Sequence, residues 1–157
     1  MKKKIKNSCI SLNKKAKYLY FIEKKIEAGL CLQGWEVKSL RRKQINIENS
    51  YIIFRNEEVF LFGSRFNPVT TLESHIQYDI MRDRKLLLHK KEIGFLHGKM
   101  SREKYVVIAL SLFWKKAWCK VVLGLAKGKS KYDKRKCTKE REWNKQKERL
   151  LKNNNKF

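Results

Sequence analysis

Positive charges interleaved with aromatic rings form the part of the sequence best suited to chemistry with another molecule. Seven cations fall within residues 127–139, and Asp133 is the only acid among them. Tyr132 lies inside this run, and Trp143 follows it. Cations neutralise phosphates and flat rings stack on unpaired bases, so the pattern favours RNA with exposed loops, and we expect no DNA partner. Charge alone leaves a solvated basic tail without fixed contacts as an open alternative.

The residue types that usually carry catalysis are sparse and scattered. The histidines stand at positions 75, 89 and 97, without the spacing of metal ligands. No phosphate-binding glycine loop or nucleophile elbow occurs. A metal-dependent nuclease needs clustered carboxylates. Four acids could come together in space, so this alternative stays open. They are Glu23, Glu27, Glu36 and Asp79. The inventory predicts a protein that is not an enzyme and holds no cofactor.

The four cysteines do not form a metal or redox motif. They stand at positions 9, 31, 119 and 137, and no pair is closer than 18 residues. Cys31 and Cys119 lie in apolar stretches, where we expect small core residues. Cys9 and Cys137 fall in basic segments and are expected to be free thiols of a reducing compartment.

The charge of the chain is large and unevenly distributed. Its 157 residues carry 39 Lys and Arg against 15 Asp and Glu, a formal net charge of +24. Residues 2–17 contain seven Lys and no acid, and residues 127–157 contain 13 cations and four acids. The middle is only mildly basic. An excess of one sign makes a polyanionic partner the expectation, with nucleic acid favoured over an anionic membrane.

The hydrophobic pattern argues against a membrane segment. The longest largely apolar run, residues 105–114, is too short to span a bilayer. Lys and Asn interrupt the N-terminus, so no signal-peptide core fits there. We therefore expect a cytoplasmic protein. We also expect it to be a monomer.

The elements that must position the basic residues are mostly strands. Residues 18–32 predict a strand bent at Ala28-Gly29, residues 35–41 one or two helical turns, and residues 50–62 a hairpin. Asp83 is a candidate N-cap for a helix from Arg84 to His97 that ends at Gly98. Two long strands follow at 105–114 and 117–126. The expected fold class is mainly β with helices, an OB-like barrel.

Three regions are predicted. Residues 1–12 are a basic flexible arm, residues 13–128 the barrel, and residues 129–157 a basic C-terminal tail. The tail has too few apolar residues to order itself, so we expect disorder in isolation. Trp143, Leu150 and Leu151 share a helical face, which predicts a helix over 138–151 on binding.

Several motifs resemble one known family. The longest is Gly29-Leu30-Cys31-Leu32-Gln33-Gly34-Trp35-Glu36-Val37-Lys38-Ser39-Leu40-Arg41. Others are Arg84–Leu88, Ala109–Leu112, Trp118–Val121, Ala126–Lys129 and Asp133–Arg135. In the same order, and over about residues 13–153, they resemble the SsrA-binding protein family (SmpB), the protein partner of tmRNA.

The resemblance implies a function. The family binds the tRNA-like part of tmRNA and delivers it to stalled ribosomes for trans-translation, without catalysis. It implies an OB-like barrel and a tail that is unstructured away from the ribosome and that occupies the empty decoding centre and mRNA channel. A structural ribosomal protein held by the same basic arms is the alternative that composition leaves open.

The resemblance also implies site residues. The tmRNA contacts carried over are Asn13, Glu27, Glu36, Lys38, Ser39, Arg41, Leu87 and Lys120. From the residues alone, the cations fit this role, the two carboxylates are unusual beside RNA, and core packing is favoured for Leu87. The ribosome-binding tail residues are Lys129, Lys131, Tyr132, Asp133, Lys134, Arg135 and Trp143.

This sequence departs from the family pattern at three positions. Tyr132 stands where members often have His, and its ring is expected to stack on an rRNA base in the same way. Ser130 replaces a usual Lys and removes one cation. Lys104 stands where Gly is common, which puts the conformation of that turn in doubt.

Overall fold

The computed structural model describes residues 8–69 and 78–154. The strands are β1 Ser8–Leu12, β2 Tyr20–Leu30, β3 Ile45–Asn46, β4 Tyr51–Arg55, β5 Glu58–Phe62, β6 Arg65–Phe66, β7 Arg84–Leu87, β8 Val106–Lys115 and β9 Trp118–Gly128. The helices are α1 Ala16–Leu19, α2 Gly34–Arg41, α3 Lys90–Glu103 and α4 Lys131–Asn154. His75, one of the three histidines considered above, lies outside the described residues.

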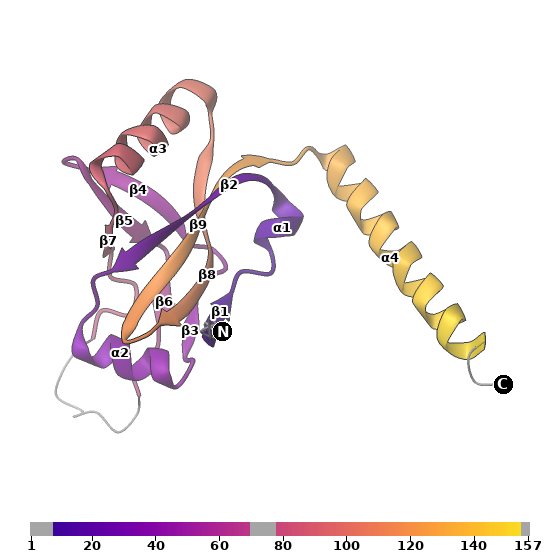
Figure 1. Cartoon of the computed structure of the whole chain (residues 1–157), viewed down its shortest axis with the longest axis horizontal. Coiled ribbons are helices and arrows are strands. Elements are labelled where there is room, and N and C mark those ends of the chain that lie inside the picture. The colour runs from indigo at the N-terminus through magenta and orange to yellow at the C-terminus, as the bar shows by residue number, and fades with distance from the viewer. Residues whose placement is uncertain (1–7, 70–77, 155–157) are drawn as a thin grey trace, which may run out of the picture.

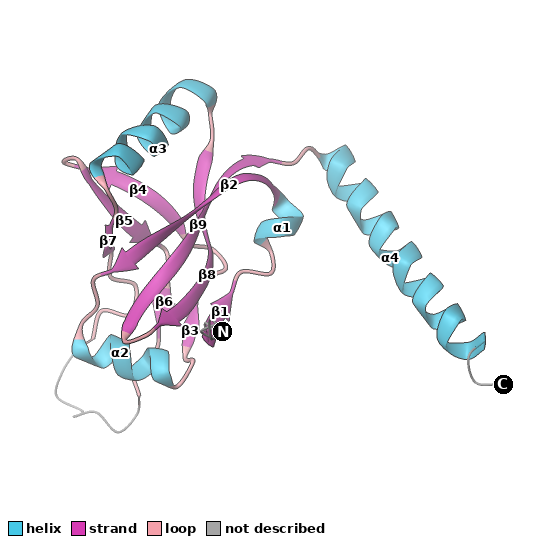
Figure 2. Cartoon of the chain, in the orientation of Figure 1, coloured by secondary structure: helices cyan, strands magenta, loops and turns pink. Residues whose placement is uncertain are grey.

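The main sheet is antiparallel and closes on itself. Its seven strands run in the order β1-β8-β4-β5-β7-β2-β9, and β9 pairs back with β8, so only β1 lies outside the closed ring. α3 and α2 lie at opposite ends of this barrel (Figures 1 and 2). The predicted mainly β, OB-like fold is confirmed.

The barrel is filled by side chains from alternate strand positions. On β9, Cys119, Val121, Leu123 and Leu125 are buried, as their alternation in the sequence predicts. Gly124 faces a second cluster, where an added Cβ would lie 2.9 Å from Leu110 Cδ1. The absence of a side chain at position 124 therefore leaves the space that the Leu110 side chain occupies over β9.

The predicted helix from Arg84 to His97 is wrong. Residues 84–87 form strand β7, and the helix begins only at Lys90. β7 pairs with β5 on one side and with β2 on the other. The free energy gained from these pairings outweighs the helix tendency that the spacing of its leucines indicates. Gly98 does not end α3 but lies inside it.

The turn after α3 shows why Gly is common at the position where this sequence has Lys104. The helix ends at Glu103, and the next residue, Lys104, has a φ of 54°, in the left-handed region. Glycine adopts this region without a Cβ penalty, so a Gly common at this position fits the backbone that the chain has here.

The N-terminal boundary also differs from the prediction. A flexible arm was expected over residues 1–12, yet β1 pairs with β8 from Ser8 to Leu12, so these residues belong to the sheet. Residues 1–7 of the expected arm lie outside the described residues. No helix among the described residues is both long and apolar enough to cross a membrane.

The C-terminal tail forms one continuous helix, α4, from Lys131 to Asn154, and this helix projects away from the barrel (Figure 1). It contains the helix predicted over 138–151 and extends it at both ends, and over 131–154 it differs from the disorder expected for the tail, whose residues 155–157 lie outside the described residues. Trp143, Leu150 and Leu151 stay exposed on it. Its base is attached to α1, because the Lys129 N–H donates to the Leu19 carbonyl at 3.0 Å.

Candidate nucleic-acid interface

A cavity of about 660 Å³ opens on the barrel surface beside the tip of the β8–β9 hairpin. Arg41 reaches it from the end of α2, Leu87 from β7, and Trp118 and Lys120 from β9. We call it the hairpin cavity. Three residues predicted to contact RNA, Arg41, Leu87 and Lys120, therefore meet at one place although 79 positions separate the first from the last.

A second cavity, of about 520 Å³, adjoins the first and shares Gly29, Leu87 and Lys120 with it. Glu27 lines this one. Its carboxylate lies 3.1 Å from the Lys115 ammonium group, and both side chains are about half exposed. A carboxylate repels RNA phosphates less when a neighbouring cation neutralises its charge. Lys115 does this for Glu27, so Glu27 is compatible with a surface that binds RNA.

The pattern of β7 explains why Leu87 is available to a partner. Arg84 and Leu86 point into the protein, so Lys85 and Leu87 point outward. Leu87 is 55% exposed, and the core packing favoured for it from the sequence is wrong. Lys38 is exposed on α2, three residues before Arg41 and therefore on the same side of the helix.

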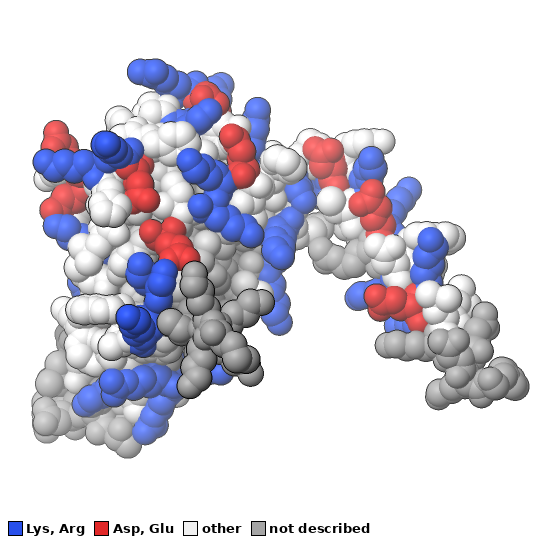
Figure 3. Space-filling model, in the orientation of Figure 1, with Lys and Arg blue, Asp and Glu red and all other residues white. Residues whose placement is uncertain are grey.

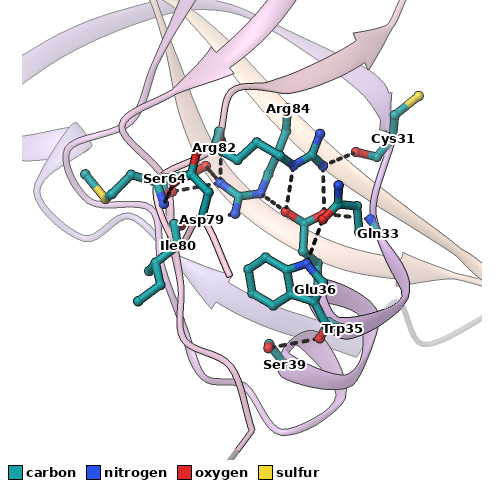
Figure 4. Close-up of polar contacts among 11 residues, drawn as sticks. Cys31, Gln33, Trp35, Glu36, Ser39, Ser64, Asp79, Ile80, Arg82 and Arg84 are labelled. Carbon is teal, nitrogen blue, oxygen red and sulfur yellow. Dashed lines mark hydrogen bonds and ion pairs between the residues drawn. The ribbon is translucent and has the colours of Figure 1, made fainter. Parts of the chain in front are cut away.

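Glu36 does not face solvent. Its side chain is fully buried, with Oε1 2.8 Å from Arg84 Nε and Oε2 2.8 Å from a terminal nitrogen of Arg82 (Figure 4). Oε2 also accepts the backbone N–H of Gln33 at 2.7 Å, which caps the start of α2. The Glu36 side chain is therefore not available at the surface, because both oxygens are already bonded to groups of this chain.

Arg84 completes this buried network. Its guanidinium donates to the carbonyls of Ser64, Arg82 and Ile80, and it lies 3.7 Å from the centroid of the Phe66 ring. Burial lowers the pKa of Arg84, and the negative charge of Glu36 opposes that shift. This ion pair holds α2 against β7.

Ser39 and Asn13 are also structural. Ser39 is buried, and its hydroxyl donates to the Trp35 carbonyl one turn back on α2, at 3.1 Å. Asn13 is buried as well, and its amide group donates to three carbonyls, those of Ile47, Glu48 and Ala109. The side chains of both residues therefore stabilise loops and helix turns inside the protein and are not exposed at the surface.

Sequence reasoning missed Trp118, which is 74% exposed at the hairpin tip. A signal was present, because this Trp follows the Lys115-Lys116 turn and precedes Lys120 in a strand whose alternate residues are core. Cys31 was expected in the core but is exposed, and it lines the same cavity. Cys119 is buried there as expected, and burial raises the pKa of its thiol to about 12.

The cationic residues at the start of the tail lead directly into helix α4 and do not form an extended segment. The Ser130 hydroxyl accepts the Asp133 N–H at 3.1 Å, and its own O–H donates to the Asp133 carboxylate at 2.7 Å. This reciprocal cap gives Asp133 a structural role. Lys129 is partly buried, with its ammonium group 2.9 Å from the Lys17 carbonyl.

The remaining predicted tail residues present cations and rings to solvent. Lys131, Tyr132 and Arg135 are exposed, Lys134 is half-buried, and Trp143 is 59% exposed. Lys and Arg side chains cover much of the barrel face in Figure 3 and continue along α4. Exposed cations are therefore present both on the barrel and along α4.

Comparison with known proteins decides the family. A family model described as SmpB protein matches residues 10–153, from β1 to nearly the end of α4. The chain belongs to the SmpB family. The resemblance drawn from its motifs is confirmed, and barrel and tail both fall within the SmpB match.

A solved structure supports the same assignment. It is described as "tmRNA-SmpB: a journey to the center of the bacterial ribosome". The matching chain is 35% identical, with a TM-score of 0.62 over 77% of this chain and 85% of its own length. SmpB is an RNA-binding family, so the exposed cations and rings lie on a fold already associated with RNA. Within the described residues, no three His, Cys, Asp or Glu side chains gather to hold a metal ion.

Proposed function

We propose that this chain binds the tRNA-like part of tmRNA and delivers it to ribosomes stalled without a usable codon, for trans-translation. Membership of the SmpB family carries the proposal. The chain's own residues support it, because cations and an exposed aromatic ring surround a recessed surface on the barrel, and a second cationic surface runs along α4. The protein acts by binding, and we assign no catalytic step to it.

We propose that the barrel and the tail have separate tasks. The face formed by Glu27, Lys38, Arg41, Leu87 and Lys120 contacts tmRNA. The tail enters the vacant decoding centre and mRNA channel of the small ribosomal subunit. α4 suits this role because its exposed cations release counterions from rRNA and its exposed rings stack on bases.

Two variants test this division. Lys38→Glu with Lys120→Glu should weaken tmRNA binding strongly, because two attractive contacts with phosphate become repulsive. Deletion of residues 129–157 should leave tmRNA binding largely intact and abolish peptide tagging. Affinity for tmRNA and tagging of a stalled reporter peptide are measured for both variants.

A matched control has the same change of charge away from this face. Lys14→Glu with Lys104→Glu alters two exposed lysines that line neither the hairpin cavity nor the cavities that Glu27 lines. Equal loss of affinity in both double variants would show that binding follows net charge alone and would overturn the placement of the face. Loss of tmRNA affinity in the tail deletion would overturn the division of tasks.

The same preparation separates this function from that of a structural ribosomal protein. A tmRNA partner should be substoichiometric to ribosomes and released by salt, since roughly 6–10 phosphate contacts lose about 10³–10⁵ in affinity between 50 and 200 mM salt. A protein that stays at one copy per ribosome through a high-salt wash would contradict the proposal.

A further inference from the structure

We propose that the hairpin cavity takes one unstacked nucleobase of the bound RNA, with Trp118 as its stacking ring and with Arg41 and Lys120 holding the phosphates beside it. The inference rests on the proposed function and deepens it, since it states what the RNA places in this site. It also assigns a role to Trp118 and to the shape of the surface, not to charge alone.

The first support is that two large apolar side chains are left in solvent at one cavity. Leu87 is 55% exposed and Trp118 is 74% exposed, and both line it. Trp114 and Leu30 line it as well. Exposed apolar groups gathered at a recess mark a binding site, because a partner that covers them removes apolar surface from water. A flat, uncharged group is the part of RNA that can do this.

The second support is the charge around the cavity. Among the residues that the structure describes, its charged lining residues are Arg41 and Lys120, and no Asp or Glu lines it. Lys38 is exposed one helical turn before Arg41. An apolar peptide or a lipid chain would leave these cations without partners, whereas a nucleotide brings an apolar face and a phosphate together.

The third support is the difference between paired and unpaired RNA. In an A-form helix the bases are stacked inside, and a protein meets mainly phosphates and 2′-hydroxyls. A recess lined by a tryptophan offers such a helix nothing to fill it. An unpaired loop nucleotide can turn its base outward, and stacking on an aromatic side chain suits every base because each has a π-face.

Two backbone features keep the cavity open. A Cβ at position 29 would lie 3.1 Å from Leu87 Cβ, so Gly29 lets Leu87 lie directly over β2. Lys116 has a φ of 56°, and this left-handed residue makes the tight turn that presents Trp118 at the start of β9. The ring is therefore held at the cavity by a rigid hairpin and not by a loose loop.

Substitution of the ring tests the proposal. Trp118→Ala should weaken binding to an RNA consisting of the tRNA-like part of tmRNA by roughly 5- to 150-fold, the range given by stacking of one base on an aromatic ring. Trp118→Phe should keep most of the affinity. Phe21→Ala, which removes an exposed ring that does not line the hairpin cavity, is the matched control and should bind that RNA like the unaltered chain.

The salt dependence of binding separates stacking from charge. Trp118→Ala should leave the slope of log affinity against log salt unchanged. Arg41→Ala with Lys120→Ala should reduce the slope by about one for each phosphate that the variant no longer neutralises. A slope that falls in Trp118→Ala would mean that this variant neutralises fewer phosphates, and it would overturn the stacking role.

A spectroscopic measurement locates the base directly. With ¹⁵N-labelled tryptophan in the full chain, the indole N–H signal of Trp118 should shift when this RNA is added. Saturating RNA without a shift of this signal, or Trp118→Ala binding within twofold of the unaltered chain, would overturn base insertion while tmRNA binding stands. Failure of the unaltered chain to bind the RNA would overturn the proposed function as well.

Discussion

Glu36 and Arg84 form an ion pair of 2.8 Å in which neither side chain is exposed to solvent. Glu36 lies on α2, five residues before Arg41, and Arg84 lies on β7, three residues before Leu87. The pair therefore fixes the two elements that supply opposite parts of the hairpin cavity. Glu36, which the family resemblance implies as an RNA contact, therefore helps to position the residues for which we propose that contact.

Removing the carboxylate should destabilise the fold. Glu36→Ala leaves the Arg84 guanidinium buried without its charged partner, and breaking a buried pair in this way costs about 3–5 kcal/mol. We expect the free energy of unfolding in urea to fall by this amount, and tmRNA affinity to fall as a consequence.

Lys38→Ala is the matched control on the same helix. Its side chain is exposed, so the free energy of unfolding should change by no more than about 0.5 kcal/mol while tmRNA affinity drops. Should Glu36→Ala retain full stability and lose only RNA binding, the structural role given to Glu36 would be wrong.

The sequence predicted what depends on local pattern and missed what depends on contacts between distant segments. The hairpin over 50–62 and the strands β8 and β9 follow from alternation and turn residues, and the structure has them. β7 was missed because its only justification is the gap between β5 and β2, which lie elsewhere in the chain.

The same limit applies to the site. Lys38, Arg41 and Lys120 could be chosen because exposed cations are plausible wherever RNA binds. The burial of Glu36 depends on Arg82 and Arg84, which follow it by 46 and 48 positions and whose approach no local pattern reveals. Trp118 could have been found from its place beside a lysine-rich turn.

The thiols should differ sharply in reactivity. Burial raises the pKa of Cys119 to about 12, so at pH 8 only about one molecule in 10⁴ has the reactive thiolate. Cys9 and Cys31 are exposed. Alkylation with iodoacetamide followed by mass spectrometry should label these two in the folded protein and Cys119 only after denaturation. Early labelling of Cys119 would contradict its burial.

The shifted thiol also predicts a pH effect on stability. The unfolded thiol loses its proton near 9.0 and the folded thiol near 12, so between these values the folded state binds more protons. The free energy of unfolding therefore decreases as pH rises above about 9. Cys119→Ala should show a shallower decrease than the unaltered chain in urea unfolding from pH 8 to 10, and identical slopes would rule out this contribution.

The cap between Ser130 and Asp133 should control the first turn of α4. Ser130→Ala removes an N-cap worth about 0.5–2 kcal/mol, so the backbone amides of residues 131–136 should exchange with deuterium roughly 2- to 30-fold faster. Thr138→Ala is the control, because the Thr138 hydroxyl donates to the Lys134 carbonyl within the helix and caps nothing. Equal exchange in both variants would argue against the cap.

The tight turn between β4 and β5 should tolerate a stabilising change. Asn56 and Glu57 have φ values of 48° and 62°, the pair of left-handed residues that a two-residue hairpin turn needs. Glycine avoids the Cβ penalty there, so Glu57→Gly should raise the free energy of unfolding by about 0.5–1 kcal/mol. Glu57→Ala removes the same side chain without relieving the backbone, and a gain equal to that of glycine would contradict this explanation.

The projection of α4 has a consequence for how strongly each surface needs to bind. Its 24 residues span about 36 Å as a helix, so the far end stands about one small-domain diameter from its attachment at Leu19. For the proposed function, the barrel and the far end of α4 can engage different partners at the same time. Docking of the barrel then raises the effective concentration of α4 at its own partner, and the reverse holds as well. Two modest affinities therefore combine into a tight bivalent assembly, which separates once either contact is released.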